Sequence, residues 1–287
     1  MDQIPVDDIL RDIGFENPVR AEVVTGGADA LLWRLRDADK SFALRLLRQD
    51  QQTQAQREIS LSNWVNTHAP NLSVPQIIRS GTWNDRPAYV MDWIEGRTLG
   101  DAAMDQSLDP EILIKLARAF GERQAQIHHM PVPTDIESFA DSWLKKVTDP
   151  LLIERIGAVQ THHQALLHLD YHPLNVMVNG SEIVAVLDWA NAAVGDPRFD
   201  LARTQAIIEL APVLPNTDTA FLTSLLEYWK SGYERVAGPV VIDPVFYWWA
   251  GALIERELTP RVGNPAIPWL NQAFIERVRT WTAAFRA

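Results

Sequence analysis

The stretch that decides the fold is "LLHLDYHPLNVMVNGSEIVAVLDWANAAVGDPRFDLAR", residues 166–203. Apolar segments rich in β-branched residues flank Asn179–Gly180, a pair that readily adopts positive φ, so the stretch predicts a β-hairpin. In an antiparallel pair, the residues before the turn lie opposite the residues after it. Asn175 and Asp188 should then lie near the same open end of the hairpin, with Asp170 in the loop just before it.

The side chains that this hairpin gathers fit more than one kind of chemistry. An asparagine and an aspartate offer hard oxygen ligands, which suit a magnesium ion that also binds phosphate oxygens. Asp170 would remain free to orient an attacking hydroxyl and accept its proton. Alternatively, His168, Asp170 and His172 alternate and would share one face of an extended segment, where they could ligate zinc or iron as in a metallohydrolase. In a purely structural interpretation, these polar residues only cap loops.

Composition narrows the class of protein. The 287-residue chain has 47% hydrophobic and 22% charged residues, as expected of an ordinary soluble protein with one large domain or two lobes. No apolar run approaches the roughly 18 residues that a membrane span needs, and the N-terminal sequence lacks the pattern of a signal peptide. The lack of cysteine excludes thiolate chemistry and makes a cytoplasmic location the default. The net charge of −11 argues against a nucleic-acid partner.

Secondary-structure patterns divide the chain near residue 93. Before it, strand patterns in 21–47, 74–83 and 86–94 surround one helical pattern in 52–68, which predicts a mostly antiparallel sheet with one long helix. After it, Asp109 as N-cap and Pro110 open a strong helix. Further helices are expected over 138–166, 200–213, 218–236, 243–258 and 266–285. The sequence therefore predicts an α+β fold with a small sheet lobe, 1–93, and a larger helical lobe, 94–287.

The opening stretch resembles a known family. "HLDYHPLNVMV" (168–178) followed by "VLDW" (186–189) is similar to the catalytic loop and the metal-binding aspartate of the aminoglycoside phosphotransferase family, small-molecule kinases with a protein-kinase-like two-lobed fold. The resemblance extends to "TGGADALLWRL", "FALRLL", "REISL", "YVMDWIEGRTL" and "GDPRFDLAR". These segments look like the phosphate-covering loop, the strand with the nucleotide-binding basic residue, its acidic partner, the hinge and the segment after the metal site.

The resemblance implies specific roles for the central residues. Asp170 would be the catalytic base or hydroxyl-positioning residue, and Asn175 and Asp188 would bind Mg²⁺. His168 and His172 would support the catalytic loop rather than react. For "GDPRFDLAR", we expect Asp196 to brace the catalytic loop by hydrogen bonds and Asp200 to cap the following helix. His128 is expected to close a helix, without a catalytic role.

The nucleotide, ATP or GTP, would bind residues from the first lobe. Glycines of the phosphate-covering loop would let the backbone approach the phosphates, and the backbone of the hinge would contact the base. The basic residue of the third strand is usually lysine in such kinases; here it is arginine, which still supplies a cation and would pair with a glutamate of the helix. This departure keeps a non-catalytic nucleotide-binding relative as an alternative. The implied nucleotide-binding residues are Gly26, Gly27, Arg45, Glu58, Asp92, Trp93 and Ile94.

The acceptor stays open at this stage. Relatives of this fold phosphorylate aminoglycosides, macrolides, amino alcohols and sugars, so the expected partner is a small hydroxylated molecule, an antibiotic or a metabolite. Trp248 and Trp249 precede Glu255 and Glu257 on one predicted helix. Such an aromatic wall with carboxylates would suit a cationic or amphipathic alcohol, although core packing is the more common role of tryptophan. The sequence does not indicate an oligomeric state.

Overall fold

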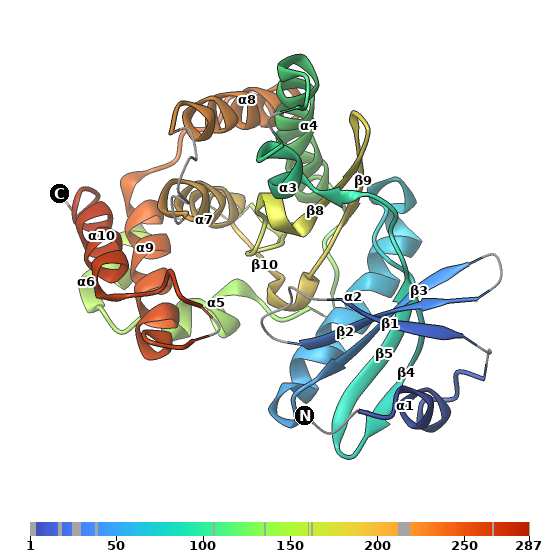
Figure 1. Ribbon diagram of the computed structural model, residues 1–287. Helices are drawn as coiled ribbons and strands as arrows, with labels where there is room; N and C mark the ends of the chain where they lie inside the picture. The colour runs from blue at the N-terminus through green and yellow to red at the C-terminus, as the bar shows by residue number, and fades with distance from the viewer. Residues whose placement is uncertain are drawn as a thin grey trace. The chain divides into compact units, whose positions relative to one another are not determined.

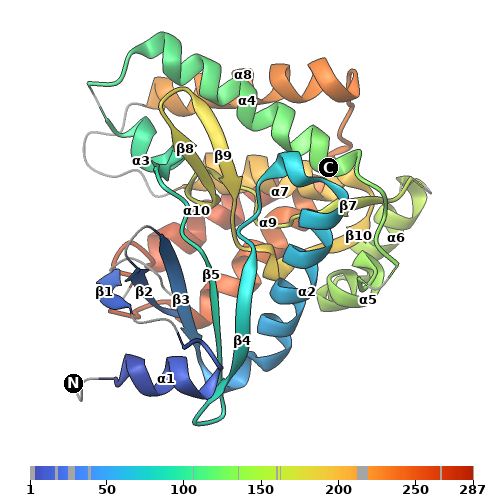
Figure 2. The ribbon, with the colours of Figure 1, turned by 90° about the vertical axis from the view of Figure 1, so that its right-hand side faces the viewer.

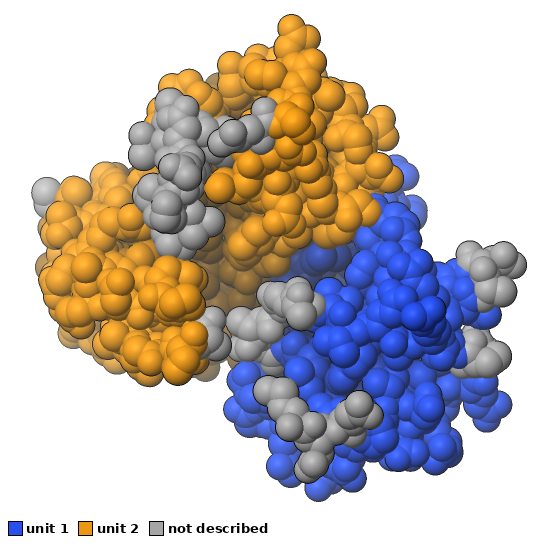
Figure 3. All heavy atoms as spheres, in the orientation of Figure 1, with its two compact units in different colours: residues 1–95, 185–190 blue, residues 96–184, 191–287 orange. Residues whose placement is uncertain are grey.

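The computed structural model describes residues 4–16, 19–24, 30–37, 40–105, 107–134, 136–159, 161, 163–211, 219–265 and 267–286. Contacts within the chain define two compact units, residues 1–95 with 185–190 and residues 96–184 with 191–287 (Figure 3). The lobe boundary expected at residues 93 and 94 stays a prediction. Among the described residues, no helix is both long enough and apolar enough to cross a membrane.

Unit 1 is built on an antiparallel sheet with the strand order β1-β2-β3-β5-β4 (Figure 1). The alternation along β3 separates the two faces of the sheet: Leu44 and Leu46 pack in one apolar cluster with α1, whereas Leu47 packs in another with Tyr89 and with Ala55 of α2. The mostly antiparallel sheet expected before residue 93 is confirmed. The elements of unit 1 are α1 (Val6–Asp12), β1 (Arg20–Val24), β2 (Ala30–Arg36), β3 (Ser41–Leu47), η1 (Gln49–Gln51), α2 (Gln52–His68), η2 (Pro70–Leu72), β4 (Ile77–Trp83) and β5 (Arg86–Asp92).

Unit 2 is mainly helical and carries two small sheets. The predicted hairpin is present as β8 and β9, with Gly180 at φ 55° in its turn (Figure 2). The elements up to this hairpin are β6 (Arg97–Thr98), α3 (Leu99–Ala103), α4 (Pro110–His128), α5 (Phe139–Ser142), η3 (Leu144–Lys146), α6 (Pro150–Val159), β7 (Ala165–Leu167), η4 (Pro173–Asn175), β8 (Val176–Asn179) and β9 (Glu182–Val186). They are followed by η5 (Trp189–Asn191), β10 (Ala193–Gly195), α7 (Pro197–Leu210), α8 (Thr219–Ala237), α9 (Pro244–Leu258), η6 (Thr259–Arg261) and α10 (Gln272–Ala283).

Helices α4 and α8 run side by side in both ribbon views (Figure 1 and Figure 2). Asp109 caps α4 as expected, because its side chain accepts a hydrogen bond from the Glu111 amide at 2.9 Å. Glycines allow the close approach: a Cβ on Gly121 would overlap the backbone of Trp229, and one on Gly232 would overlap the backbone of Arg118. The two helices therefore touch backbone to backbone.

The long helix expected over residues 138–166 is wrong. The segment forms α5, η3 and α6, followed by strand β7, which pairs antiparallel with β10. Pro150 has no amide hydrogen and so begins a new helix, and the Asp149 side chain accepts from the Leu151 amide at 3.0 Å. The helix expected from residue 266 likewise begins later, because Asn271 caps α10 by accepting from the Phe274 amide at 3.0 Å.

Candidate active site

The loop between β7 and β8 is held in a constrained backbone conformation. Leu169 is fully buried and has φ of 60°, a left-handed conformation that costs a non-glycine residue about 1–2 kcal/mol. Its amide donates to Asp200 Oδ1 at 2.6 Å, and the His168 amide donates to Asp200 Oδ2 at 3.3 Å. The Asp170 amide donates to His168 Nδ1, also at 3.3 Å. Buried hydrogen bonds thus fix the backbone that leads into Asp170.

The Asp170 carboxylate lies at the surface of unit 2 beside Asn175. Its side chain is 24% exposed, and Asn175 Nδ2 donates to its Oδ2 at 3.3 Å and to its backbone oxygen at 3.0 Å. His172 Nε2 lies 3.7 Å from Asp170 Oδ1. The Asn175 amide nitrogen makes these hydrogen bonds, and its Oδ1 makes none with the residues that the structure describes. A carboxylate with one long hydrogen bond can accept a proton, and the amide oxygen suits a hard cation.

The two histidines of the loop bind backbone groups. His168 is fully buried, and its Nδ1 accepts from the Asp170 amide. His172 Nδ1 accepts from the Leu174 amide at 3.3 Å and so caps η4. Within the described ranges, no three His, Asp or Glu side chains are grouped so as to hold a metal ion. The premise of the zinc or iron alternative, one face that carries His168, Asp170 and His172 as ligands, is therefore not met there.

In the structure, Asp196 has the role expected for Asp200, and Asp200 has the role expected for Asp196. Asp196, not Asp200, caps α7: its side chain accepts from the Arg198 amide at 3.1 Å and from the amide and hydroxyl of Thr161, each at 3.0 Å. The expected brace from Asp196 to the catalytic loop is thus wrong, because Asp200 makes those bonds. Pro197 explains the difference, since its fixed φ and missing amide hydrogen suit the first helical position and start α7 earlier than expected.

Asp200 also belongs to a buried polar network that was not predicted from the sequence. His128 joins Asp200 Oδ2 through Nε2 at 2.9 Å and the Tyr233 hydroxyl through Nδ1 at 2.8 Å. Gln124 donates to the same carboxylate oxygen at 3.1 Å and accepts from Trp229 Nε1 at 2.8 Å. Burial raises the pKa of Asp200, but hydrogen bonding and electrostatic attraction from His128 outweigh it and leave the pKa below its usual value. The available signal was the pair Gln124 and His128, one turn apart on the buried face of α4.

In unit 1, Arg45 and Glu58 form a buried ion pair with a third member. Arg45 Nη1 lies 2.5 Å from Glu58 Oε1, and the Tyr89 hydroxyl donates to Glu58 Oε2 at 2.6 Å. The Arg45 and Glu58 side chains are 14% and 6% exposed, so this is not an ordinary surface pair. Burial raises the pKa of Glu58 against the opposing attraction of Arg45, while Asp188 raises it further. Burial and Glu58 together keep the pKa of Tyr89 well above its usual value, so Tyr89 remains a donor.

Asp188 belongs by its contacts to unit 1 and has a left-handed backbone, with φ of 60°. Such a conformation persists in a non-glycine residue only where the surroundings enforce it, and it clusters at functional sites. Buried Trp189 anchors this turn by donating from Nε1 to the Val186 oxygen at 3.1 Å. The Asp188 carboxylate makes no hydrogen bond or ion pair with the residues that the structure describes. Asn175 precedes β8 and Asp188 follows β9, and their joint role stays a proposal.

The expected hinge continues from the end of β5. The Asp92 amide donates to the Gln76 oxygen at 3.0 Å, and the Trp93 amide donates to the Ser41 oxygen at 3.3 Å. The Arg34 guanidinium lies over the Trp93 ring, 4.6 Å from its centroid. The backbone of Ile94 makes no hydrogen bond within the described part of the chain, and its contact with a base stays a prediction. Gly26 and Gly27 lie outside the described residues.

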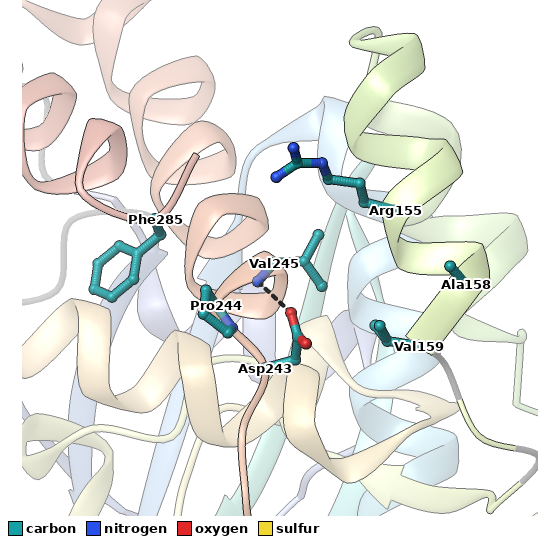
Figure 4. A pocket seen from close by; sticks show the side chains of 7 residues that line it. All are labelled: Arg155, Ala158, Val159, Asp243, Pro244, Val245 and Phe285. Carbon is teal, nitrogen blue, oxygen red and sulfur yellow. Dashed lines mark hydrogen bonds between the residues drawn. The ribbon is translucent and has the colours of Figure 1, made fainter. Parts of the chain in front are cut away.

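The tryptophans considered for the acceptor serve mainly as core. Trp248 and Trp249 are buried in a large apolar cluster of unit 2. The nearby carboxylates are paired: Glu255 with Arg279 at 2.5 Å and Glu257 with Arg203 at 2.9 Å. A separate cavity of about 290 Å³ lies in unit 2 and includes none of the residues to which the sequence assigned a role (Figure 4). Its lining residues are Arg155, Ala158, Val159, Asp243, Pro244, Val245 and Phe285.

Comparisons with known proteins agree on one family and one fold. The sequence model of a phosphotransferase enzyme family matches residues 20–239. Among solved structures, a thermostable mutant of aminoglycoside phosphotransferase APH(4)-Ia superposes with a TM-score of 0.67 at 15% identity, over 98% of this chain and 99% of that one. Spectinomycin phosphotransferase APH(9)-Ia, in complex with ADP and spectinomycin, superposes with a TM-score of 0.63 at 14% identity, over 98% and 97%. No curated protein matches the sequence.

These similarities show the fold. Both structural relatives are phosphotransferases with the protein-kinase-like architecture of an antiparallel sheet lobe and a helical lobe, which is the α+β fold expected from the sequence. Another APH(4)-Ia structure is a ternary complex with AMP-PNP and hygromycin B; it has a TM-score of 0.64 at 14% identity and covers 97% of each chain. At such identities, the ligands of these relatives are properties of the relatives alone.

Proposed function

The chain belongs to the phosphotransferase enzyme family, and from that premise we propose that it transfers the γ-phosphoryl group of ATP or GTP to a hydroxyl group of a small molecule. The observation that carries the proposal is Asp170: a partly exposed carboxylate with one long hydrogen bond, on a backbone fixed by buried bonds. A cytoplasmic location is part of the same proposal, supported by the lack of cysteine.

In the proposed reaction, the acceptor hydroxyl passes its proton to Asp170 while its oxygen bonds to the γ-phosphorus. The bond from that phosphorus to the oxygen bridging the β-phosphate breaks, and the nucleoside diphosphate leaves. Phosphoryl transfer needs little covalent work from the protein, so positioning and electrostatics carry the catalysis. Arg45, oriented by Glu58 and Tyr89, would present its guanidinium to the phosphates.

Two side chains fit the magnesium ion that such a reaction uses. Asn175 Oδ1 and the Asp188 carboxylate are hard oxygen donors, and each lacks a hydrogen-bond partner among the described residues. They would hold the ion. When bound, the ion would neutralise part of the negative charge of the phosphate groups. The left-handed backbone of Asp188 would then serve to aim its carboxylate.

The acceptor is proposed as a class, an antibiotic such as an aminoglycoside or a metabolite alcohol. Hygromycin B and spectinomycin are bound by structural relatives, which makes hydroxylated antibiotics the first candidates. Since both Glu255 and Glu257 are paired with arginines, these carboxylates give no separate support to a cationic acceptor. A screen must therefore include neutral and cationic alcohols.

The first prediction tests Asp170. We expect Asp170→Asn to reduce turnover by about 10²–10⁴-fold, because the amide cannot accept the hydroxyl proton, while the Kd for the nucleotide stays nearly unchanged. Turnover is measured as ATP or GTP consumption against a panel of hydroxylated antibiotics and metabolites, with and without Mg²⁺, and nucleotide binding by calorimetry.

The exposed Glu154 on α6 provides the control, because Glu154→Gln removes a carboxylate of unit 2 without touching the loop. Full turnover in Asp170→Asn would show that another group accepts the proton. Tight nucleotide binding without transfer to any acceptor would instead favour the non-catalytic relative.

A further inference from the structure

Arg203 is a buried arginine that joins three elements beneath the catalytic loop. It lies on α7, one turn after Asp200, and only 5% of it is exposed. Its Nε donates to the Leu169 backbone oxygen at 2.5 Å, and its Nη2 donates to Glu257 Oε2 on α9 at 2.9 Å. The guanidinium carbon lies 5.2 Å from the centre of the Trp143 ring. The guanidinium thus connects the residue before Asp170 with α9.

Stability alone does not account for a guanidinium at this position. Removing a guanidinium from water is expensive, and an apolar side chain of similar volume is often as stabilising or more so. In addition, Nη1 of Arg203 is buried and makes no hydrogen bond within the part of the chain that the structure describes. What arginine offers instead is a rigid planar fork that makes two hydrogen bonds in fixed directions.

At Leu169, the direction of the hydrogen bonds to the backbone determines the local conformation. Leu169 has a left-handed backbone, and α7 holds it from both sides: Asp200 accepts from its amide, and Arg203 donates to its carbonyl. Asp200 and Arg203 are three residues apart, so they project from the same face of the helix. The carbonyl of residue 169 belongs to the peptide group that ends at the Asp170 nitrogen. Rotation of this peptide group would therefore swing the Asp170 side chain.

We propose that Arg203 is a positioning residue for phosphoryl transfer, which fixes the Leu169–Asp170 peptide group, and that Glu257 orients Arg203 for this task. The proposal rests on the proposed function in one respect, the role of Asp170 as the group that receives the hydroxyl proton. A misplacement of about 1 Å in a reacting group can lower the rate by about 10²-fold, so loss of the fork acts on kcat. Substrate binding, which does not need the carboxylate in its reactive position, is left nearly intact.

The test compares Arg203 with Arg198, another arginine of α7. The Arg198 side chain is 16% exposed, and its hydrogen bonds to described residues go to Asp196 and the Val159 oxygen rather than to the catalytic loop, so Arg198→Met is a matched control. We expect Arg203→Met to lower kcat by about 10²-fold, with KM for both substrates and the nucleotide Kd within about twofold of wild type. Arg203→Lys retains the charge but loses the fork, and is expected to rescue only part of kcat. Glu257→Ala, which leaves Arg203 in place, is expected to lower kcat by about tenfold, and Glu257→Gln by less.

Two readouts separate positioning from general damage. If Arg203 acts through Asp170, the double variant Arg203→Met/Asp170→Asn should be no slower than Asp170→Asn alone, whereas independent effects would multiply. Amide hydrogen exchange of residues 168–171 should be faster in Arg203→Met and unchanged in Arg198→Met. This second readout needs no acceptor and no turnover.

The outcomes distinguish this inference from the proposed function. A folded Arg203→Met or Arg203→Lys protein with wild-type kcat and wild-type exchange overturns the positioning role, even if Asp170→Asn is inactive. An Arg203→Met protein in which KM rises while kcat keeps its wild-type value also overturns the role. The same holds for a double variant whose loss of kcat equals the product of the two single losses. If Asp170→Asn remains active while exchange of the loop still rises in Arg203→Met, the proposed role of Asp170 fails and the structural tie of Arg203 to the loop stands. Should Arg203→Met not fold, Arg203→Lys and Glu257→Ala decide.

Discussion

Asp200 carries a charge in a place where burial alone would neutralise it. The carboxyl is completely buried, which raises its pKa, yet hydrogen bonding and electrostatic attraction from His128, attraction from His168 and a hydrogen bond from Gln124 bring the pKa below its usual value. A carboxylate whose pKa is lower in the folded than in the unfolded chain contributes stability above the unfolded pKa of about 3.9, and this stability is lost as pH falls through the folded pKa. The ionised form of Asp200 is therefore part of what holds Leu169 in place.

At the residue scale we predict that His128→Leu lowers the free energy of unfolding by about 1.5–3 kcal/mol at pH 7, the range for a hydrogen bond to a charged group. Without His128, the strongest of the causes that lower the pKa of Asp200 is lost, so this pKa is higher in the variant than in wild type. Asp200 therefore takes up a proton at a higher pH in the variant than in wild type, so the difference in stability between the two proteins should shrink on acidification. Urea unfolding followed by circular dichroism at pH 7 and pH 4 measures both values.

Tyr233→Phe is the control for this prediction, since it removes the 2.8 Å bond to the other ring nitrogen of His128 and leaves Asp200 untouched. Its effect should be smaller and should change little with pH. A loss in His128→Leu that is equally large at both pH values would contradict the role given to the Asp200 charge.

At the scale of elements, the contact between α4 and α8 depends on glycine. Gly121 and Gly232 each face the backbone of the opposite helix with no room for a methyl group. Because the obstacle is backbone rather than a flexible side chain, the helices must move apart to accommodate a larger residue. The separation would stretch the bonds that join His128 to Tyr233 and Gln124 to Trp229.

We therefore expect Gly121→Ala to destabilise the protein by about 1–3 kcal/mol, despite the better helix propensity of alanine. Gly157, on α6, is the matched control: a Cβ there would meet no atom of the described residues within 4 Å, so Gly157→Ala should stabilise by about 0.5–1 kcal/mol. Thermal and urea unfolding of both variants provide the comparison. Equal shifts of the same sign would show that helix propensity, not close approach, decides at Gly121.

For the whole molecule, the notable feature is that unit 1 is discontinuous in sequence. Residues 185–190 group by contact with residues 1–95, although about ninety residues separate the two segments. The short segment contributes the buried side chains of Ala185, Val186, Trp189 and Ala190, as well as Asp188. Residues 1–95 alone therefore lack part of unit 1.

This leads to a prediction about fragments. Residues 1–95 alone should show weaker amide protection in β3 and β5 than the same strands show in the whole protein, because part of the apolar surface of unit 1 loses its cover. A peptide of residues 184–191 added in excess should restore part of the protection, and a peptide with Trp189→Ala less of it. Equal protection in the fragment and the whole chain would mean that residues 185–190 are not needed for the unit.

The sequence predicted those features that depend on neighbouring residues. The strand patterns before residue 93, the turn at Asn179–Gly180 and the cap at Asp109 are local patterns, and all three are present. Strand β7 was missed because its partner β10 lies far along the chain, so pairing rather than propensity makes it a strand. The predicted roles of Asp196 and Asp200 were wrong for a similar reason, because the hydrogen-bond partners of Asp200 lie on other elements, far away in the sequence.

The contact between α4 and α8 also affects folding of the chain during its synthesis on the ribosome. His128 and Tyr233 are separated by 105 residues, which a ribosome adds in roughly 5–20 s. Throughout that interval, the newly made α4 exposes a stripe with Gly121, Gln124 and His128 whose partners have not yet been synthesised. The loop that carries Asp170 emerges midway and must wait as well. Asp200 holds this loop, His128 and Gln124 make hydrogen bonds to Asp200, and Tyr233 and Trp229 of α8 bind these two side chains in turn. Ribosome-bound chains that stop before α8 should therefore lack an ordered catalytic loop, whatever the state of their N-terminal sheet.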